Sequence, residues 1–597
     1  MTTTRRLGTR VAMTRTGSLG AGAVVTRTRW LGVVVAVTVV VAVGSTGCAV
    51  IPVTGPHSVA DAGGGDPLSK PFQRMIAIRP QKGWSPAQLI RGLQAAMAAY
   101  PDDPKILPSY LTPNALAKWD PSGPVNVIED GFEVLPPGPR DGSDAVLKVS
   151  LKARWVAKIN EDDSYVPTIG DWDGGAFELV KDAEDNYRVN DLPRGLLLTA
   201  SDVARAYRAT NLYYLSRNPQ DPRLVADRVW LRLKPTESFA QTILERLIEP
   251  PTSALQGGAV TTSFPPGTQV KSITHGDDRV VVNLSGGLDP VRDESLLAQI
   301  RYSLNRNEVA KGRTIEVQVD GEVYGLDQPN SDERWLDDSS DTAYYVNRGA
   351  VHYLGKDGPA GTVQGPAGEP REGYSGFALS REGDGLIAAR TSTGISVAGL
   401  TQEGRWQEVI RGADLTAPTW HRDGSLWTYD RQNAALLRYD PAGGGGAQRV
   451  TFPLKGLDVT RFRIARDGVR VAVTTGKNTV QIGAFIEGAG GTQPGNFHML
   501  TTTEIGEKIL DLAWEDADHL LVLIENKAGQ ILNQVNVGDG ETVGVPLKEA
   551  LGSLAAQGDR VLAATDDGAK VVELNQDQKT WTAKIESDGG APLFPLG

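Results

Sequence analysis

The chain has 597 residues and an acidic balance, with 61 Lys and Arg against 72 Asp and Glu and a formal net charge of −11. An acidic balance argues against nucleic acid as a partner, and a single cysteine excludes internal disulfides and thiolate metal sites. The length suggests three or four domains, and 68 Gly and 36 Pro with 6% aromatic residues favour β-rich structure with many turns.

The N-terminus has the pattern of an export signal. Residues 1–30 contain six arginines and no acid, and residues 31–43 form an apolar run that is mostly valine. This run of 13 residues is typical of a signal peptide and is shorter than the roughly 20 residues that cross a bilayer. The alternative is a short signal anchor that is never cleaved.

The only cysteine follows this apolar run. Cys48 closes the tetrapeptide Ser45-Thr46-Gly47-Cys48, which resembles the bacterial lipobox. Gly47 and Cys48 match that motif, whereas Ser45 stands where leucine is usual. The resemblance implies cleavage between Gly47 and Cys48, a signal peptide over residues 1–47, and a diacylglyceryl cysteine at Cys48 with a further palmitate-type chain. Several acyl chains anchor a protein firmly, whereas one chain binds a membrane only marginally.

Residues 48–68 are rich in Pro and Gly and predict a flexible tether. Residues 69–220 after it predict an α+β unit. Ser85, Pro86 and Gln88 have the pattern of a capped helix start. In this unit we expect a helix from this cap to Tyr100 and a short helix over 114–119. Apolar and polar residues then alternate as in strands over 145–159, 175–181 and 187–189. Helices followed by an antiparallel sheet resemble an NTF2-type domain in the order of their elements.

Residues 222–330 predict a second α+β unit. The expected elements are strands over 229–233, 270–273, 280–284 and 314–319, with amphipathic helices over 238–248 and 296–304. Five short segments carry a resemblance to the GerMN domain of spore-germination and cell-envelope proteins: Leu247–Pro251, Pro266–Thr268, Val282–Ser285, Leu297–Leu304 and Val317–Gly321.

Residues 340–597 predict short strands and turns with a loose internal repeat. The repeated turns are Gly383–Gly385, Arg422–Gly424, Arg466–Gly468, Asp516–Asp518 and Gly558–Asp559, each between two short apolar stretches. Successive turns fall about 40 to 50 residues apart, which is the length of one four-stranded blade, so we expect a β-propeller of about six blades. Five or seven blades are also compatible with the spacing, and a pair of β-sandwiches is the alternative fold.

No residue pattern predicts a catalytic, cofactor or metal site. The six histidines are isolated, and neither a Gly-x-Ser-x-Gly elbow nor a phosphate-binding loop occurs after Cys48. Asp384, Asp423 and Asp467 could be taken for calcium ligands or paired catalytic carboxylates. An Asp-Gly turn more often closes a hairpin, because Gly accepts positive φ and Asp bonds its own backbone. We therefore expect a protein that is not an enzyme.

The order of lipobox, tether, α+β unit, GerMN-like unit and propeller resembles the actinobacterial LpqB lipoprotein family over nearly the whole chain. The resemblance implies a lipid-anchored protein on the extracytoplasmic face of the cell membrane. It also implies an accessory role toward the sensor kinase MtrB, in a two-component system for envelope homeostasis and division. A propeller that binds or hydrolyses cell-wall glycan is the alternative, because carboxylates from different blades could meet unseen by sequence. A structural envelope component is a third possibility.

Overall fold

The computed structural model describes residues 57–60 and 73–597, apart from gaps at 101, 137–145, 169, 219–220, 235–236, 286, 288–292, 328–334, 337–341, 382, 489–490, 505 and 576. The predicted signal peptide, with Gly47 and Cys48, and most of the predicted tether lie outside the described residues. Within the tether segment, β1 (His57–Ala60) pairs antiparallel with β2 (Gln73–Ile76). None of the described helices has the length and apolar content that crossing a membrane requires.

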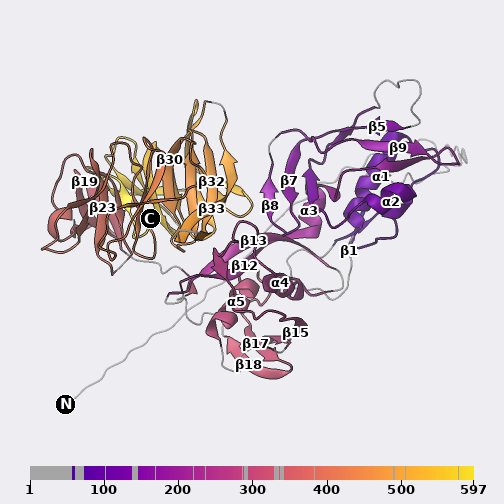
Figure 1. The fold of residues 1–597 in the computed structure, drawn as a ribbon, viewed down its shortest axis with the longest axis horizontal. Helices are drawn as coiled ribbons and strands as arrows, with labels where there is room; N and C mark the ends of the chain where they lie inside the picture. The colour runs from indigo at the N-terminus through magenta and orange to yellow at the C-terminus, as the bar shows by residue number, and fades with distance from the viewer. Residues whose placement is uncertain are drawn as a thin grey trace, which may run out of the picture. The chain divides into compact units, whose positions relative to one another are not determined.

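The first unit is α+β, as expected (Figure 1). Its helices are α1 (Pro86–Ala99), η1 (Leu107–Tyr110), α2 (Pro113–Lys118) and α3 (Ala200–Ala206). Its strands are β3 (Val125–Ile128), β4 (Glu133–Val134), β5 (Leu147–Val149), β6 (Leu151–Lys152), β7 (Trp155–Ile159), β8 (Tyr165–Pro167), β9 (Phe177–Lys181), β10 (Tyr187–Asp191) and β11 (Leu196–Thr199). The predicted cap of α1 is present, because Ser85 Oγ accepts from Gln88 N at 3.3 Å and Gln88 Oε1 accepts from Ser85 N at 2.9 Å.

Two features of this unit differ from the prediction. The strand expected over 145–159 is three strands, because β5 pairs with β9, β6 with β4 and β7 with β3. The sheet is also not purely antiparallel, since β11 pairs with β3 in parallel. The chain between β3 and β11 spans more than the dozen or so residues that a parallel crossover needs.

The second unit begins with a long antiparallel pair, β12 (Tyr207–Ser216) and β13 (Leu224–Arg232). β12 lies before the boundary expected at residue 220, yet it pairs with β13 after that boundary. The other elements are α4 (Phe239–Ile248), β14 (Val260–Thr261), β15 (Val270–His275), β16 (Arg279–Leu284), α5 (Glu294–Asn305), β17 (Thr314–Val319) and β18 (Glu322–Asp327). The predicted helices and strands are matched in order by α4, β15, β16, α5 and β17, whereas β14 and β18 were not predicted. The sheet runs β15-β16-β17-β18.

The C-terminal part is a β-propeller, as expected (Figure 1). Its described residues form six four-stranded sheets. The first sheet contains β19 (Ala343–Asn347), β20 (Ala350–Gly355) and β21 (Gly358–Thr362), and the second contains β22 (Ser375–Leu379), β23 (Leu386–Arg390), β24 (Gly394–Gly399) and β25 (Gln407–Arg411). The third contains β26 (Thr419–Trp420), β27 (Leu426–Asp430), β28 (Ala435–Tyr439) and β29 (Gln448–Val450), and the fourth contains β30 (Val459–Ile464), β31 (Arg470–Thr475), β32 (Thr479–Gly488) and β33 (Gly491–Thr502). The fifth contains β34 (Lys508–Trp514), β35 (His519–Asn526), β36 (Gly529–Asn536) and β37 (Thr542–Val545), and the sixth contains β38 (Leu551–Gln557), β39 (Arg560–Thr565), β40 (Val571–Leu574) and β41 (Trp581–Ile585).

The C-terminus closes the ring of sheets. Strand β42 (Pro592–Leu593) joins the first sheet beside β19, so this sheet combines the two ends of the propeller. Figure 1 accordingly shows the C-terminus within the propeller. Each of the other five sheets is built from four strands consecutive in sequence. Three tryptophans lie in the core of the propeller, since Trp420, Trp427 and Trp514 are all at most 3% exposed.

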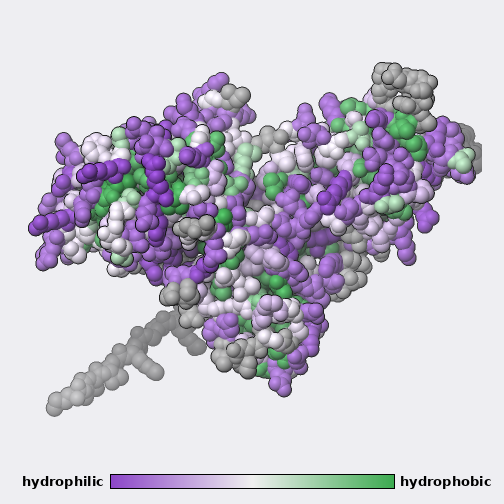
Figure 2. All heavy atoms as spheres, in the orientation of Figure 1, coloured by the Kyte–Doolittle hydropathy of each residue, from purple (hydrophilic) through white to green (hydrophobic). Residues whose placement is uncertain are grey.

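Polar residues dominate the face of the molecule drawn in Figure 2, and apolar side chains are gathered in small separate groups. The apolar core of the second unit extends into the propeller, because Val469 and Ala484 belong to the same buried cluster as Leu244 and Leu297. Shared burial of this kind removes apolar surface of both parts from water. The second unit and the propeller are therefore in direct packing contact.

Candidate functional site at the junction of the second unit and the propeller

The repeated turns found in the sequence join the first two strands of five successive sheets. These first strands run in the same direction, so their turns share one rim of the propeller. The rim faces β12 and β13 of the second unit. We call the set of contacts between these two strands and the rim the junction. At Gly468 the turn is tight, with φ of +72°, and an added Cβ would lie 3.2 Å from Arg422 Cβ.

A single carboxylate, Asp221, joins the loop between β12 and β13 to two of the repeated turns. Arg422 Nε donates to Asp221 Oδ2 at 2.8 Å, and Arg381 Nη1 lies 3.2 Å from the same oxygen. Arg223, at the start of β13, lies 3.0 Å from Asp221 Oδ1. Burial opposes ionisation of Asp221, yet the arginines, with Arg422 foremost, hold its pKa below the ordinary value. The loop is thus tied to the rim by one charge shared among three guanidiniums.

Replacement of Asp221 by asparagine should loosen this loop. Three arginines would lose their shared negative charge, and charge-assisted hydrogen bonds contribute about 1.5 to 3 kcal/mol each to stability. We expect a loss of roughly 2 kcal/mol in the free energy of unfolding by urea, since the group is 20% exposed. Asp384→Asn is the matched control, because Asp384 lies in an exposed turn of the same rim. Equal stability of the two variants would contradict the assignment.

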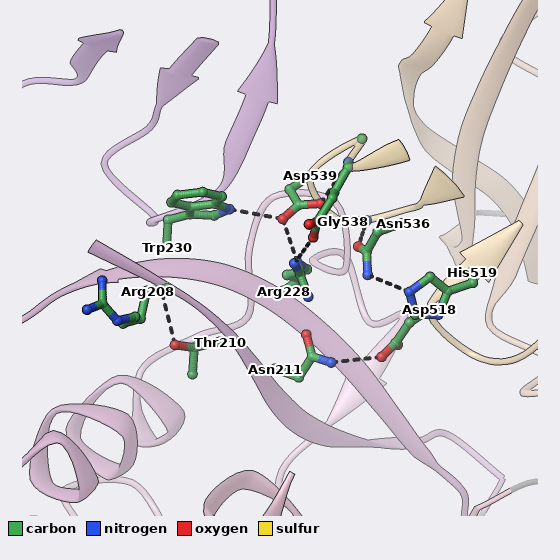
Figure 3. Close-up of polar contacts among 12 residues, drawn as sticks. Arg208, Thr210, Asn211, Arg228, Trp230, Asp518, His519, Asn536, Gly538 and Asp539 are labelled. Carbon is green, nitrogen blue, oxygen red and sulfur yellow. Dashed lines mark hydrogen bonds and ion pairs between the residues drawn. The ribbon is translucent and has the colours of Figure 1, made fainter. Parts of the chain in front are cut away.

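Strand β13 and the turn between β36 and β37 form the second part of the junction (Figure 3). Arg228 Nε donates to Asp539 Oδ2, and Arg228 Nη2 donates to Glu541 Oε2 at 2.7 Å. Trp230 Nε1 donates to the same Asp539 oxygen at 3.1 Å. The ring of Trp230 also stacks on Tyr165 of the first unit, with centroids 4.5 Å apart. One tryptophan therefore contacts all three parts of the chain.

Asp518, in the turn between β34 and β35, forms the third part (Figure 3). Asn211 Nδ2 of β12 donates to Asp518 Oδ2 at 2.8 Å. Burial and the nearby charge of Asp516 raise the pKa of Asp518 to about 6. Burial favours the neutral ring of His519, but its hydrogen bond to Asp516, at 3.0 Å, raises the pKa of that histidine. This part of the junction therefore holds two groups whose pKa values are raised above their ordinary values.

Buried side chains complete the junction. Arg470, at the start of β31, donates to the carbonyl oxygen of Ala226 in β13 and lies 3.3 Å from Asp467. Asp227, the next residue of β13, accepts from Thr252 N and Thr252 Oγ1, both at 2.7 Å. Burial raises the pKa of Asp227. A buried polar group needs bonded partners, and these groups have them: Arg470 is paired with Asp467, and Asp227 is hydrogen-bonded to Thr252.

The hairpin of β32 and β33 extends the contact. These strands, of 10 and 12 residues, are the longest among the described strands of the propeller. Glu487 pairs with Arg217, and Glu487 N donates to the carbonyl oxygen of Gly257 at 3.1 Å. Asn496 Nδ2 donates to the carbonyl oxygen of Gln256 at 2.9 Å. The hairpin therefore holds the loop that follows α4.

Two cavities adjoin the junction. The larger, of about 290 Å³, is lined by all three parts of the chain, including Tyr165, Leu255, Phe497 and His498. Its volume lies at the lower end of the range for small-molecule sites. The smaller, of about 210 Å³, is lined by Glu515, Asp516 and Asp518 and by Arg422 and Arg466, among others. Charged groups of both signs thus face the smaller cavity.

The residues singled out from the sequence do not form a catalytic constellation. Asp423 Oδ1 accepts from Ser425 N at 2.8 Å and Asp467 Oδ1 from Val469 N at 2.7 Å, so both carboxylates bond their own turns, as expected. Asp384 lies in an exposed turn. Within the part of the chain that the structure describes, no three His, Cys, Asp or Glu side chains come together in a way that could hold a metal ion. The predicted lipidation site, Cys48, and cleavage site, Gly47, lie outside that part.

Sequence reasoning missed the residues that make the junction. Arg228 and Asp539 are 311 positions apart, and Asn211 and Asp518 are 307 apart. The turn Asp516–Asp518 departs from the Gly-containing turns of the other repeats, and that departure was a visible signal of a special role. Nothing in the sequence pattern shows which strand it contacts.

Three family models match successive parts of the chain. "Lipoprotein LpqB, N-terminal domain" matches residues 79–204, "Sporulation and spore germination", the Germane model, matches residues 211–325, and "Lipoprotein LpqB beta-propeller domain" matches residues 353–595. The resemblance of the second unit to a GerMN domain is thereby confirmed.

Similar proteins named Lipoprotein LpqB match over most of the chain. The protein from Thermobifida fusca is 27% identical, with 94% of this chain and 98% of that protein covered. The one from Streptomyces coelicolor is 28% identical, with coverages of 87% and 90%. The one from Mycobacterium tuberculosis is 23% identical, with coverages of 92% and 97%. The three matched domains and the similar proteins point to the same family, and the chain belongs to the LpqB lipoprotein family.

Proposed function

We propose that this lipoprotein is anchored at Cys48 to the outer face of the cell membrane and regulates a sensor kinase of the MtrB type by binding its extracellular part. The kinase would belong to a two-component system for envelope homeostasis and division. The observation that supports a binding role is the junction itself. Bonded, mostly buried charges tie the second unit to one rim of the propeller, which gives a preorganised scaffold.

The opposite rim of the propeller supports docking of a partner. It is formed by the turns after the second strand of each sheet, such as 391–393, 431–434 and 476–478. The bonds of these described turns stay within the propeller; Arg431, for example, pairs with Asp414 at 3.3 Å and Asp458 at 3.1 Å. A rim of loops on a rigid scaffold is a common location for binding surfaces. Catalysis forms no part of the proposal.

The anchor is part of the same proposal. We take residues 1–47 as the signal peptide and 48–68 as the tether. Of the three domains that follow, the second begins with β12 rather than at residue 222, and the third covers residues 340–597. Cys48→Ser should shift the protein from the membrane pellet to the soluble fraction, because the thiol that carries the lipid is gone. The measurement is fractionation of cells followed by immunoblotting, with Ser45→Leu as the control that should stay anchored. Full retention of Cys48→Ser in the pellet would indicate an uncleaved signal anchor.

In-cell crosslinking tests the partner. The lipidated protein is captured from membranes after crosslinking, and attached peptides are identified by mass spectrometry. Enrichment of a sensor kinase's extracellular domain over the Cys48→Ser sample is the expected result. Recovery of wall glycan fragments without a kinase would contradict the proposal and favour the alternative below.

The alternative, a propeller that binds or hydrolyses cell-wall glycan, has one specific observation in its favour. In the smaller cavity, burial raises the pKa of Glu515, and the pKa of Asp518 is raised to about 6. For Asp516, the hydrogen bond and charge of His519, with two backbone hydrogen bonds, together outweigh burial and lower the pKa. Carboxylates with pKa values pushed apart are typical of acid–base pairs. Release of reducing sugar from purified wall by the wild type, lost in Asp516→Asn, would establish this alternative.

A further inference from the structure

Strand β30 carries a row of arginines along the inner ring of the propeller. It is the first strand of its sheet, and the first strands of successive sheets contact one another around a ring that β42 completes. Arg461 and Arg463 lie on one side of β30, and the buried Phe462 and Ile464 lie on the other. Arg466 continues the row into the following turn. Three guanidiniums thus follow one strand near the axis of an otherwise acidic protein.

Two of these arginines have protein partners. Arg461 donates to Asp511 at 3.4 Å and to the carbonyl oxygens of Ile509 and Leu510. Arg466 donates to the carbonyl oxygens of Pro595 and Ala556. Both side chains are therefore fixed by backbone acceptors of neighbouring strands.

Arg463, between them, differs. Among the residues that the structure describes, none lies within hydrogen-bond or ion-pair distance of its guanidinium. Its backbone pairs with Ala472 of β31, and its carbonyl oxygen also accepts from Trp514 Nε1 at 3.2 Å. Burial lowers the pKa of Arg463; of the charges around it, Asp511 opposes this shift, and Arg461 and Arg390 add to it. A guanidinium stays protonated in proteins, and no acceptor among the described residues compensates the charge of this one.

Asp511, the carboxylate that acts on Arg463, is already used by other groups. Asp511 is 8% exposed, its Oδ1 faces Arg461, and its Oδ2 accepts from Leu554 N at 2.9 Å. Arg390 also keeps a backbone acceptor, the carbonyl oxygen of Leu415 at 3.2 Å. The surroundings of Arg463 therefore hold an excess of positive charge, although Arg463 itself is only partly buried and open to solvent.

We propose that Arg463 is the centre of an oxyanion-binding site at the propeller axis, which takes a small oxyanion with a phosphate or carboxylate group. The planar fork of a guanidinium matches two oxygens of such a group. Arg461 and Arg390 add positive electrostatic potential at this site, and their own hydrogen bonds hold them in place. A small oxyanion would neutralise the one guanidinium of the row that lacks a protein acceptor.

The test is calorimetric titration of the full-length protein in detergent, in a buffer free of oxyanions, with inorganic phosphate and separately with acetate. The wild type should bind at least one of them, and Arg463→Gln should bind it at least roughly tenfold more weakly, the equivalent of one charge-assisted hydrogen bond. Binding of phosphate alone would identify a dianion site, and binding of acetate alone a carboxylate site. Arg411→Gln, at a side chain 91% exposed on the same propeller, is the control and should bind as the wild type does.

Thermal unfolding keeps the test decisive if titration heats are small. Without oxyanion, Arg463→Gln should be as stable as the wild type or more so, since an uncompensated charge is removed. With phosphate or acetate, only the wild type and Arg411→Gln should gain stability. Equal gains in all three proteins, or no binding by the wild type to either anion, would overturn the proposal.

Discussion

Arg228→Ala should be the most damaging single change at the junction, with a loss of about 3 to 5 kcal/mol in the free energy of unfolding. The side chains of Arg228 and Asp539 are 18% and 1% exposed. Without the guanidinium, Asp539 would remain buried and charged. The donor that it would keep from β13 is the indole N–H of Trp230. Loss of one partner of a buried pair leaves an uncompensated charge, and that penalty exceeds the net contribution of the pair itself.

Urea unfolding of the full-length protein, followed by tryptophan fluorescence, measures this loss. The signal sums the 12 tryptophans of the chain, of which Trp230 lies at the junction, between Tyr165 and Asp539. Arg348→Ala is the matched control: its pair with Asp588 is 77% and 60% exposed, and exposed pairs contribute about 0 to 1 kcal/mol. If Arg228→Ala lost no more stability than Arg348→Ala, the junction would not be held by its buried charges.

Local signals in the sequence predicted the separate parts of the fold. The cap at Ser85 and Gln88 fixed the start of α1 to the residue, because the bonds that make it lie within one turn of helix. The repeated turns located the strand pairs of the propeller for the same reason, since each turn and its two strands are contiguous in sequence.

Interactions between distant segments could not be predicted in this way. The alternation over 145–159 is that of one strand, but β5, β6 and β7 pair with three different partners, which a single sequence does not reveal. β12 pairs with β13 across an expected boundary because pairing depends on the partner strand rather than on local composition. The junction combines both difficulties: Arg228, Trp230 and Asp518 look like ordinary strand and turn residues until the fold brings their partners to them.

The titration of Asp518 and His519 should make the junction less stable as the pH rises, whereas Asp221 and Asp516, whose pKa values are lowered, act in the opposite direction at lower pH. Asp518 titrates near its ordinary value of 3.8 when unfolded and at about 6 when folded, so the folded protein binds more protons between these values. Stability therefore decreases with rising pH across this interval. His519 acts in the same direction: its raised pKa gives stability that is present below its ordinary value of 6.5 and lost as the pH rises through the folded pKa.

Asp518→Asn isolates the carboxylate. The amide oxygen can still accept from Asn211, but the negative charge beside Asp516 is gone. We expect the variant to be more stable than the wild type by about 2 kcal/mol at roughly pH 8 and to match it near pH 4. The same substitution made in a His519→Gln background removes the titration of the histidine and should preserve the difference. A variant that is less stable than the wild type at the higher pH would mean that Asp518 contributes more to the junction as an ion than its desolvation costs, and the pKa of Asp518 would then have to lie below its ordinary value.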